Sequence, residues 1–144
     1  MHHAVRGVTL SIAIASSVIL AVGCGSEQTA ATGEPPEVAA VRLFIKGLEV
    51  TIHVPLNRGQ MERLEVRLYA ANGSRITGFD DQFQLTFTFT PTSLGTVTAV
   101  PDKPLFKDIA PSTTPGLLGS LTVLAEHEQT MTSRTFGPFE VLVH

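Results

Sequence analysis

The sequence predicts an all-β protein, an antiparallel sandwich of two sheets, and three observations support this prediction. Apolar and polar residues alternate over most of residues 38–144, as in strands that bury one face and expose the other. These alternating runs are rich in β-branched and aromatic residues, which strands favour. Turn-forming residues interrupt them at short intervals, and seven or eight short strands with frequent turns are typical of a sandwich.

The strands are predicted from runs in which every second residue is apolar. These runs are residues 48–54, 64–68, 83–90, 121–126 and 139–143. Asn72-Gly73 predicts a tight turn, because both residues tolerate a positive φ. Residues 91–116 contain five prolines and are predicted to be a long loop with one short strand near Thr96–Val100.

Part of this domain resembles the immunoglobulin-like repeats of bacterial surface proteins. In residues 64–80 (LEVRLYAANGSRITGFD) and 84–89 (QLTFTF), a strand, an Asn-Gly turn, a short apolar stretch and a glycine precede a second strand. Residues 119–126 and 139–143 look like the last two strands of such a domain. The resemblance implies an immunoglobulin-like antiparallel β-sandwich of fibronectin-like or bacterial type, because the cysteine pair and core tryptophan of antibody domains are missing. A different sandwich, including a transthyretin-like one, stays open.

Residues 1–23 are predicted to be a signal peptide. One charged residue, Arg6, precedes an uncharged apolar stretch at residues 8–23 that ends in small residues. A helix needs roughly 20 apolar residues to cross a bilayer core, so this stretch is short for a permanent span. We therefore exclude this predicted signal-peptide helix from the folded domain.

The residues Ala21, Val22, Gly23 and Cys24 resemble the lipobox of bacterial lipoproteins. In that family, small residues precede a cysteine that is lipidated and begins the mature chain. The resemblance implies a lipid anchor on Cys24, although Ala21 stands where leucine is usual. The residue after the cysteine is Gly25 rather than aspartate, which implies sorting to the outer membrane. Ordinary signal-peptidase cleavage at the same small residues and retention of the apolar stretch as an anchor are the alternatives.

Residues 24–37 are predicted to be the lipidated cysteine and a flexible tether. The stretch 27–37 (EQTAATGEPPE) has no large apolar residue, so it cannot bury enough surface to offset its ordering entropy. A flexible chain of this length holds the domain roughly 20 Å from the membrane. The folded domain is therefore predicted to span residues 38–144.

The composition excludes several classes of function. A single cysteine cannot form a disulfide framework or a cysteine-based metal cluster. A net charge of −3 without a basic stripe argues against nucleic acid as a partner. The nucleophile-elbow pattern G-x-S-x-G and the phosphate-loop pattern G-x-x-x-x-G-K-[ST] are both missing. The sequence therefore predicts a chain that is not an enzyme and has no cofactor, with a small envelope enzyme as the least favoured reading.

Adjacent carboxylates at Asp80 and Asp81 are the candidate metal ligands. Ca²⁺ takes six to eight oxygen ligands, and Asp102 and Asp108 could join only if the 91–116 loop folds back. The spaced D-x-D-x-D-G pattern is missing, and neighbouring carboxylates point in different directions. We therefore interpret this pair as solvated turn acids and predict no metal site.

The histidines of the domain allow an acid–base interpretation that the spacing does not favour. Glu126-His127-Glu128 lacks the H-E-x-x-H spacing of zinc proteases, and we interpret it as the hairpin turn between the last two strands. His53 is expected on the exposed face of its strand, as an ordinary surface residue.

Two features could bind a partner. Gln84, Thr86, Thr88 and Thr90 form one polar face of a predicted strand, which would be flat and rich in hydrogen-bonding groups; a solvated face selected for β propensity is the plainer interpretation. The predicted loop from Thr90 to Gly116 is longer than a compact domain usually leaves without a role. It could instead wrap and protect a sheet edge.

Together these features predict an exported, non-catalytic envelope lipoprotein that serves as a structural or protein-interaction module. A carbohydrate- or small-ligand-binding surface lipoprotein is the alternative. The expected partners are the membrane, through the lipid anchor on Cys24, and an envelope protein or a glycan.

Overall fold

The computed structural model of the chain describes residue 33 and residues 35–144. The strands in this part of the chain are β1 (Ala40–Ile45), β2 (Leu48–Glu49), β3 (His53–Leu56), β4 (Glu62–Tyr69), β5 (Phe83–Thr90), β6 (Gly95–Ala99), β7 (Phe106–Pro111), β8 (Leu117–His127) and β9 (Thr132–Val143). Two short 3₁₀ helices, η1 (Asp80–Gln82) and η2 (Thr92–Leu94), flank β5. Among the described residues, none of the helices is long and apolar enough to cross a membrane.

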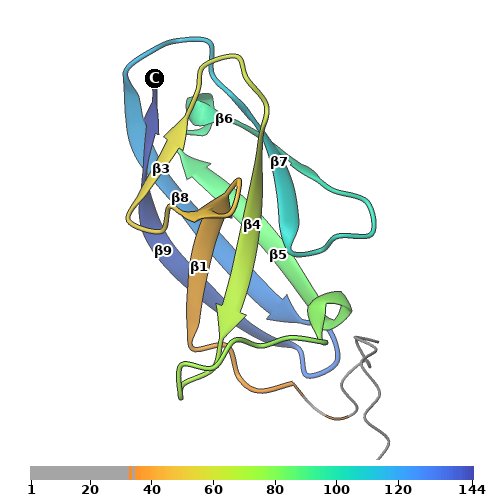
Figure 1. The fold of residues 1–144 in the computed structure, drawn as a ribbon. Helices are drawn as coiled ribbons and strands as arrows, with labels where there is room; N and C mark the ends of the chain where they lie inside the picture. The colour runs from red at the N-terminus through yellow and green to blue at the C-terminus, as the bar shows by residue number, and fades with distance from the viewer. Residues whose placement is uncertain (1–32, 34) are drawn as a thin grey trace, which may run out of the picture.

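The strands form two sheets that face each other (Figure 1). One sheet has the order β2-β1-β4-β7-β6, and the other has the order β3-β9-β8-β5. Without the short strands β2 and β3, these are the four-strand and three-strand sheets of an immunoglobulin-like sandwich. The predicted fold class is therefore confirmed. One pairing differs from the antiparallel expectation, because β3 runs parallel to β9.

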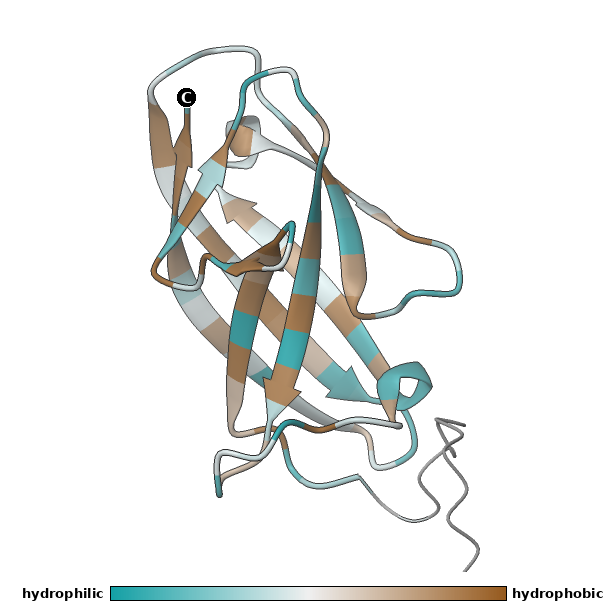
Figure 2. Cartoon of the chain, viewed as in Figure 1, coloured by the Kyte–Doolittle hydropathy of each residue, from teal (hydrophilic) through white to brown (hydrophobic). Residues whose placement is uncertain are grey.

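The core lies between the sheets and is built by the predicted alternation, which is visible as hydropathy bands along the strands in Figure 2. On β4 every second residue is buried, and on β5 the side chains Phe83, Leu85 and Phe89 point inward. The inward residues of β8 and β9 complete this core, and the fully buried ones include Leu121, Val123, Val141 and Val143. The Asn72-Gly73 turn is also present, with a positive φ of 82° at Gly73.

The prediction of one strand over residues 48–54 is wrong. β2 ends at Glu49, and β3 begins at His53 in the opposite sheet, so the chain crosses between sheets within the run. Leu48 and Ile52 are consequently exposed, at 72% and 79%. The hydroxyl of Thr51 accepts a hydrogen bond from the Leu43 N–H at 3.0 Å, where β2 no longer continues the ladder.

The predicted long loop between Thr90 and Gly116 is also wrong. This stretch holds η2, β6 and β7, and β7 lies inside its sheet between β4 and β6. β6 confirms the short strand expected near Thr96–Val100. The prolines do not prevent these strands, because Pro101 and Pro104 lie between β6 and β7 and Pro111 is the last residue of β7.

Candidate functional site

The predicted lipidation site lies outside the described residues. Cys24 and the lipobox residues Ala21, Val22 and Gly23 are not among them, nor is most of the predicted tether. The described end of the predicted tether reaches the domain through Pro35, Pro36 and Glu37, which lead into the buried Val38. This segment and the C-terminus lie at opposite ends of the sandwich (Figure 1).

The polar strand face predicted from the sequence lies on β5. Gln84, Thr86, Thr88 and Thr90 are all exposed, on the outer side of their sheet. β5 is the last strand of this sheet, and it pairs with β8 without interruption from Phe83 to Thr90. The structure thus places the predicted face on a sheet edge, where backbone groups on one side have no partner strand within the described residues.

A shallow groove lies beside this edge, between β5 and β6. Its volume is about 230 Å³, and Phe87, Phe89 and Val97 line it together with Thr88, Thr92 and Gly95. The Lys107 ammonium lies 5.9 Å from the centre of the Phe87 ring, and burial lowers the pKa of this lysine. The groove is therefore mostly apolar, and the exposed backbone edge of β5 borders it.

The acidic pair is not assembled into a metal centre. Asp80 and Asp81 are exposed in η1, and Asp108 is held elsewhere by Arg63, whose Nε lies 2.8 Å from its Oδ1. Partial burial raises the pKa of Asp80, with Arg75 opposing this shift and Asp81 adding to it. No group of three or more metal-ligating side chains occurs in the part of the chain that the structure describes.

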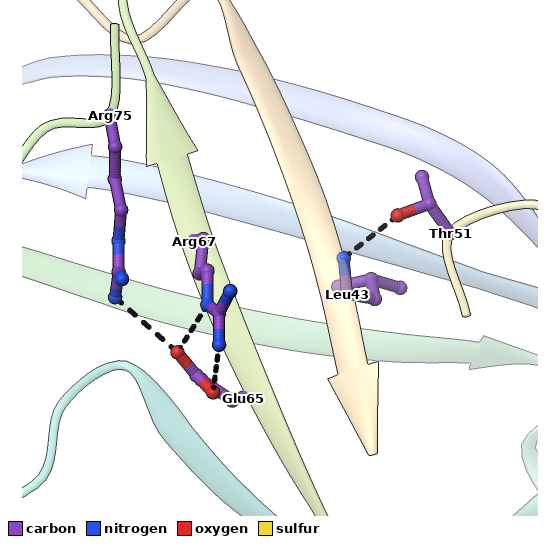
Figure 3. Close-up of polar contacts among 5 residues, drawn as sticks. All are labelled: Leu43, Thr51, Glu65, Arg67 and Arg75. Carbon is purple, nitrogen blue, oxygen red and sulfur yellow. Dashed lines mark hydrogen bonds and ion pairs between the residues drawn. The ribbon is translucent and has the colours of Figure 1, made fainter. Parts of the chain in front are cut away.

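Charged side chains on the outer face of the first sheet are paired with one another (Figure 3). Glu65 accepts hydrogen bonds from Arg67 at 2.6 and 3.0 Å and from Arg75 at 3.3 Å. The bonds from Arg67 are the main reason why the pKa of Glu65 is lowered. The Arg67 guanidinium also lies 3.8 Å from the centre of the Phe44 ring and covers it. Glu65 therefore ties together two arginines on this face of the sheet.

The predicted turn at Glu126-His127-Glu128 is corrected by one to two residues. Glu126 and His127 belong to β8, and only Glu128 lies in the turn. His127 faces inward and is 5% exposed. Leu121, Val123 and Ala125 are every second residue and face inward, and the same alternation reaches residue 127. This pattern could have predicted that His127 is buried. His53 is exposed as expected, and its Nδ1 lies 3.1 Å from Glu140.

The hydrogen bonds of His127 define its ring. The Thr130 N–H donates to Nδ1 at 3.1 Å, so Nδ1 is an acceptor and the ring proton is assigned to Nε2. Nε2 then donates to Oε1 of Gln82 at 3.3 Å. The Thr130 hydroxyl lies 2.6 Å from Nδ1 and 2.8 Å from the Thr132 hydroxyl. The buried imidazole therefore ends a chain of two hydroxyls that leads toward the surface.

This chain lines a pocket of about 280 Å³ that the sequence did not predict. One wall is the inner face of β8 and β9, where His127 pairs with Thr132 and Ala125 with Arg134. The other wall is the Pro35–Val38 segment. The pocket brings together residues about a hundred positions apart in the sequence, and the lining is Pro35, Pro36, Glu37, Val38, Phe83, Ala125, His127, Thr130, Thr132, Ser133 and Arg134.

Comparison with known proteins adds little to this description. No protein-family model and no curated protein matches the chain. Among solved structures, the chain is similar to the filamin domain of Lin-41, with 16% sequence identity and a TM-score of 0.39. The match covers 71% of this chain and 91% of that one. The immunoglobulin-like fold therefore rests on the strand order and the sheet pairing.

Proposed function

We propose that the chain is an exported lipoprotein, anchored in the outer membrane through Cys24, whose domain is a non-catalytic protein-interaction module. The anchor is supported by the lipobox-like residues before Cys24 and by the short apolar stretch that precedes them. The non-catalytic role is supported by the pairing of Glu65 with Arg67 and of Asp108 with Arg63. The hydrogen bonds from these arginines lower the pKa of both carboxyl groups, which makes them weaker bases.

The open edge of β5 is the observation that carries the interaction role. Edge strands are templates for pairing with another chain, and proteins usually protect them with short length, charge, proline or a bulge. β5 has eight residues, carries neither charge nor proline, and pairs with β8 in unbroken register. The other edges are shorter: β2 has two residues, β3 has four and includes Pro55, and β6 has five.

The chemistry of this edge fits an extended segment of a protein partner. Strand addition takes most of its affinity from main-chain hydrogen bonds and its specificity from alternate side chains. A segment paired with β5 would point every second side chain into the groove beside Phe87 and Val97. Apolar residues at those positions would match this lining.

Capture from envelope extract tests the interaction role. The chain, purified from membranes in detergent, serves as bait, and captured material is analysed for both protein and glycan. The proposal predicts a captured protein that protease treatment of the extract removes. Capture of a glycan in its place would favour the alternative, carbohydrate binding, and would contradict the interaction role.

Membrane fractionation tests the anchor separately. Cys24→Ala removes the thiol that lipidation requires, so the chain should move from the membrane fraction to the soluble fraction. Ser26→Ala, two residues away, is the matched control and should remain with the membranes. Continued membrane retention of the Cys24→Ala chain would contradict a lipid anchor at this residue.

A further inference from the structure

The pocket between β9 and the Pro35–Val38 segment has the composition of a small-ligand site. Phe83, Val38 and Ala125 give it an apolar floor, and each of these residues is at least nine-tenths buried. Hydroxyls and one guanidinium stand at its rim. A mostly apolar cavity with a few converging polar groups is the usual form of such sites. Its volume, about 280 Å³, suits only a small molecule.

Arg134 is the cation of this pocket, and its present partners hold it weakly. Its Nη1 donates to the Val38 carbonyl at 3.1 Å and lies 3.5 Å from Oε1 of Glu37. The Glu37 side chain is 88% exposed, and exposed ion pairs contribute little stability. Both hydrogen bonds involve Nη1, so the remaining guanidinium donors can reach a guest in the pocket.

The hydroxyl pair beside Arg134 has a fixed polarity. Because Nδ1 of His127 is an acceptor, the Thr130 hydroxyl, which lies 2.6 Å from it, donates to Nδ1, and the Thr132 hydroxyl donates to Thr130. Thr132 therefore presents lone pairs to the pocket, and the donor for an anionic group is Arg134 rather than Thr132.

We propose that this pocket binds a small organic carboxylate with an apolar or ring-shaped body. Arg134 pairs with the carboxylate, because a guanidinium presents parallel N–H donors that match its two oxygens. The body of the ligand lies on Phe83, Val38 and Ala125. The pocket touches β5 only at its first residue, Phe83, and shares no lining residue with the groove beside Phe87, so its test and the test of the proposed interaction role can fail separately.

Glu37 is a carboxylate of the chain itself that contacts the guanidinium proposed to hold the ligand. Its single long contact to Arg134 is replaced when a ligand forms two shorter ones. Because Glu37 belongs to the segment that joins the tether to the domain, ligand binding releases that side chain. The Glu37 carboxylate is thus an internal competitor, and its removal should strengthen binding.

Amide-resolved NMR of the full chain in detergent micelles tests this site, with benzoate as the probe and benzyl alcohol as its neutral analogue. Benzoate should change the amide chemical shifts of residues 130–134, and these changes should approach saturation as the benzoate concentration rises. Benzyl alcohol should bind about tenfold more weakly, because it lacks the charge that pairs with Arg134. Absence of saturable shifts, or equal binding of both probes, would overturn the proposal.

Three variants sharpen the test. Arg134→Gln should weaken benzoate binding about tenfold, whereas Glu37→Gln should strengthen it by about two- to fivefold. Arg42→Gln is the matched control, because Arg42 is as exposed as Arg134 at 52% and likewise lies near a glutamate and an aromatic ring, and it should leave binding unchanged. Unchanged binding in Arg134→Gln or Glu37→Gln would contradict the proposal.

Discussion

Phe44 lies on the outer face of its sheet and is nevertheless only 7% exposed. Arg67 covers the ring from the neighbouring strand, and Glu65 holds the guanidinium in place with two hydrogen bonds. A bidentate pair of this kind fixes a side chain that would otherwise be mobile. The sequence pattern places these residues on one face, but it does not say that they neutralise one another.

Glu65 should make stability depend on pH. Its pKa is lowered in the folded chain, so its contribution is present above the ordinary carboxyl pKa of 4.5 and is lost as pH falls through the lowered value. Glu65→Gln should lower the free energy of unfolding by about 1 kcal/mol at pH 7. Below pH 4 this difference from the unaltered chain should shrink.

Denaturant unfolding at pH 7 and pH 3 measures this effect. Glu128→Gln, which alters an exposed carboxylate in the β8–β9 turn, is the control and should change stability little at either pH. A Glu65→Gln deficit of the same size at both pH values would show that the loss does not come from the carboxylate charge.

At the scale of the element, β4, β5 and the parts of β8 and β9 at residues 121–126 and 139–143 follow from alternation, because one face of each packs on the core. The crossing between β2 and β3 could not be predicted in this way, since its alternation continues while the chain changes sheets. Of the two strands near the prolines, β6 was predicted, and β7 was missed because proline disfavours only the interior of a strand. The pocket was missed because its two walls meet only in the folded chain.

The passage of the chain from β2 to β3 depends on the Thr51 hydroxyl, and removal of this hydroxyl should destabilise the fold. The Thr51 hydroxyl accepts from the Leu43 N–H and donates to Glu49 at 3.0 Å. Thr51→Val keeps the shape but leaves the Leu43 amide without this acceptor, which should cost about 1–3 kcal/mol. Thr51→Ser retains the hydroxyl and should cost less than half as much. Thermal unfolding measures both, and equal losses would contradict this role.

At the scale of the whole molecule, the pocket beside Arg134 and the groove beside β5 have no lining residue in common. Residues 35–38, which end the predicted tether, line the pocket at one end of the sandwich, and β5 runs from that end toward the opposite one (Figure 1). On our proposal, the anchored end faces the membrane and the β5 edge stays accessible to an extended segment of another protein. Neither arrangement requires catalysis by the domain.

Comparing capture by two lysine variants tests this account most directly. Thr88→Lys places a charge on the edge strand β5, whereas Thr135→Lys places the same charge on the exposed face of β9, two strands away in the same sheet. A partner that pairs with the β5 edge should be captured at least about tenfold less by Thr88→Lys and unchanged by Thr135→Lys. Equal capture by both variants, or loss with Thr135→Lys alone, would contradict an interaction through this edge.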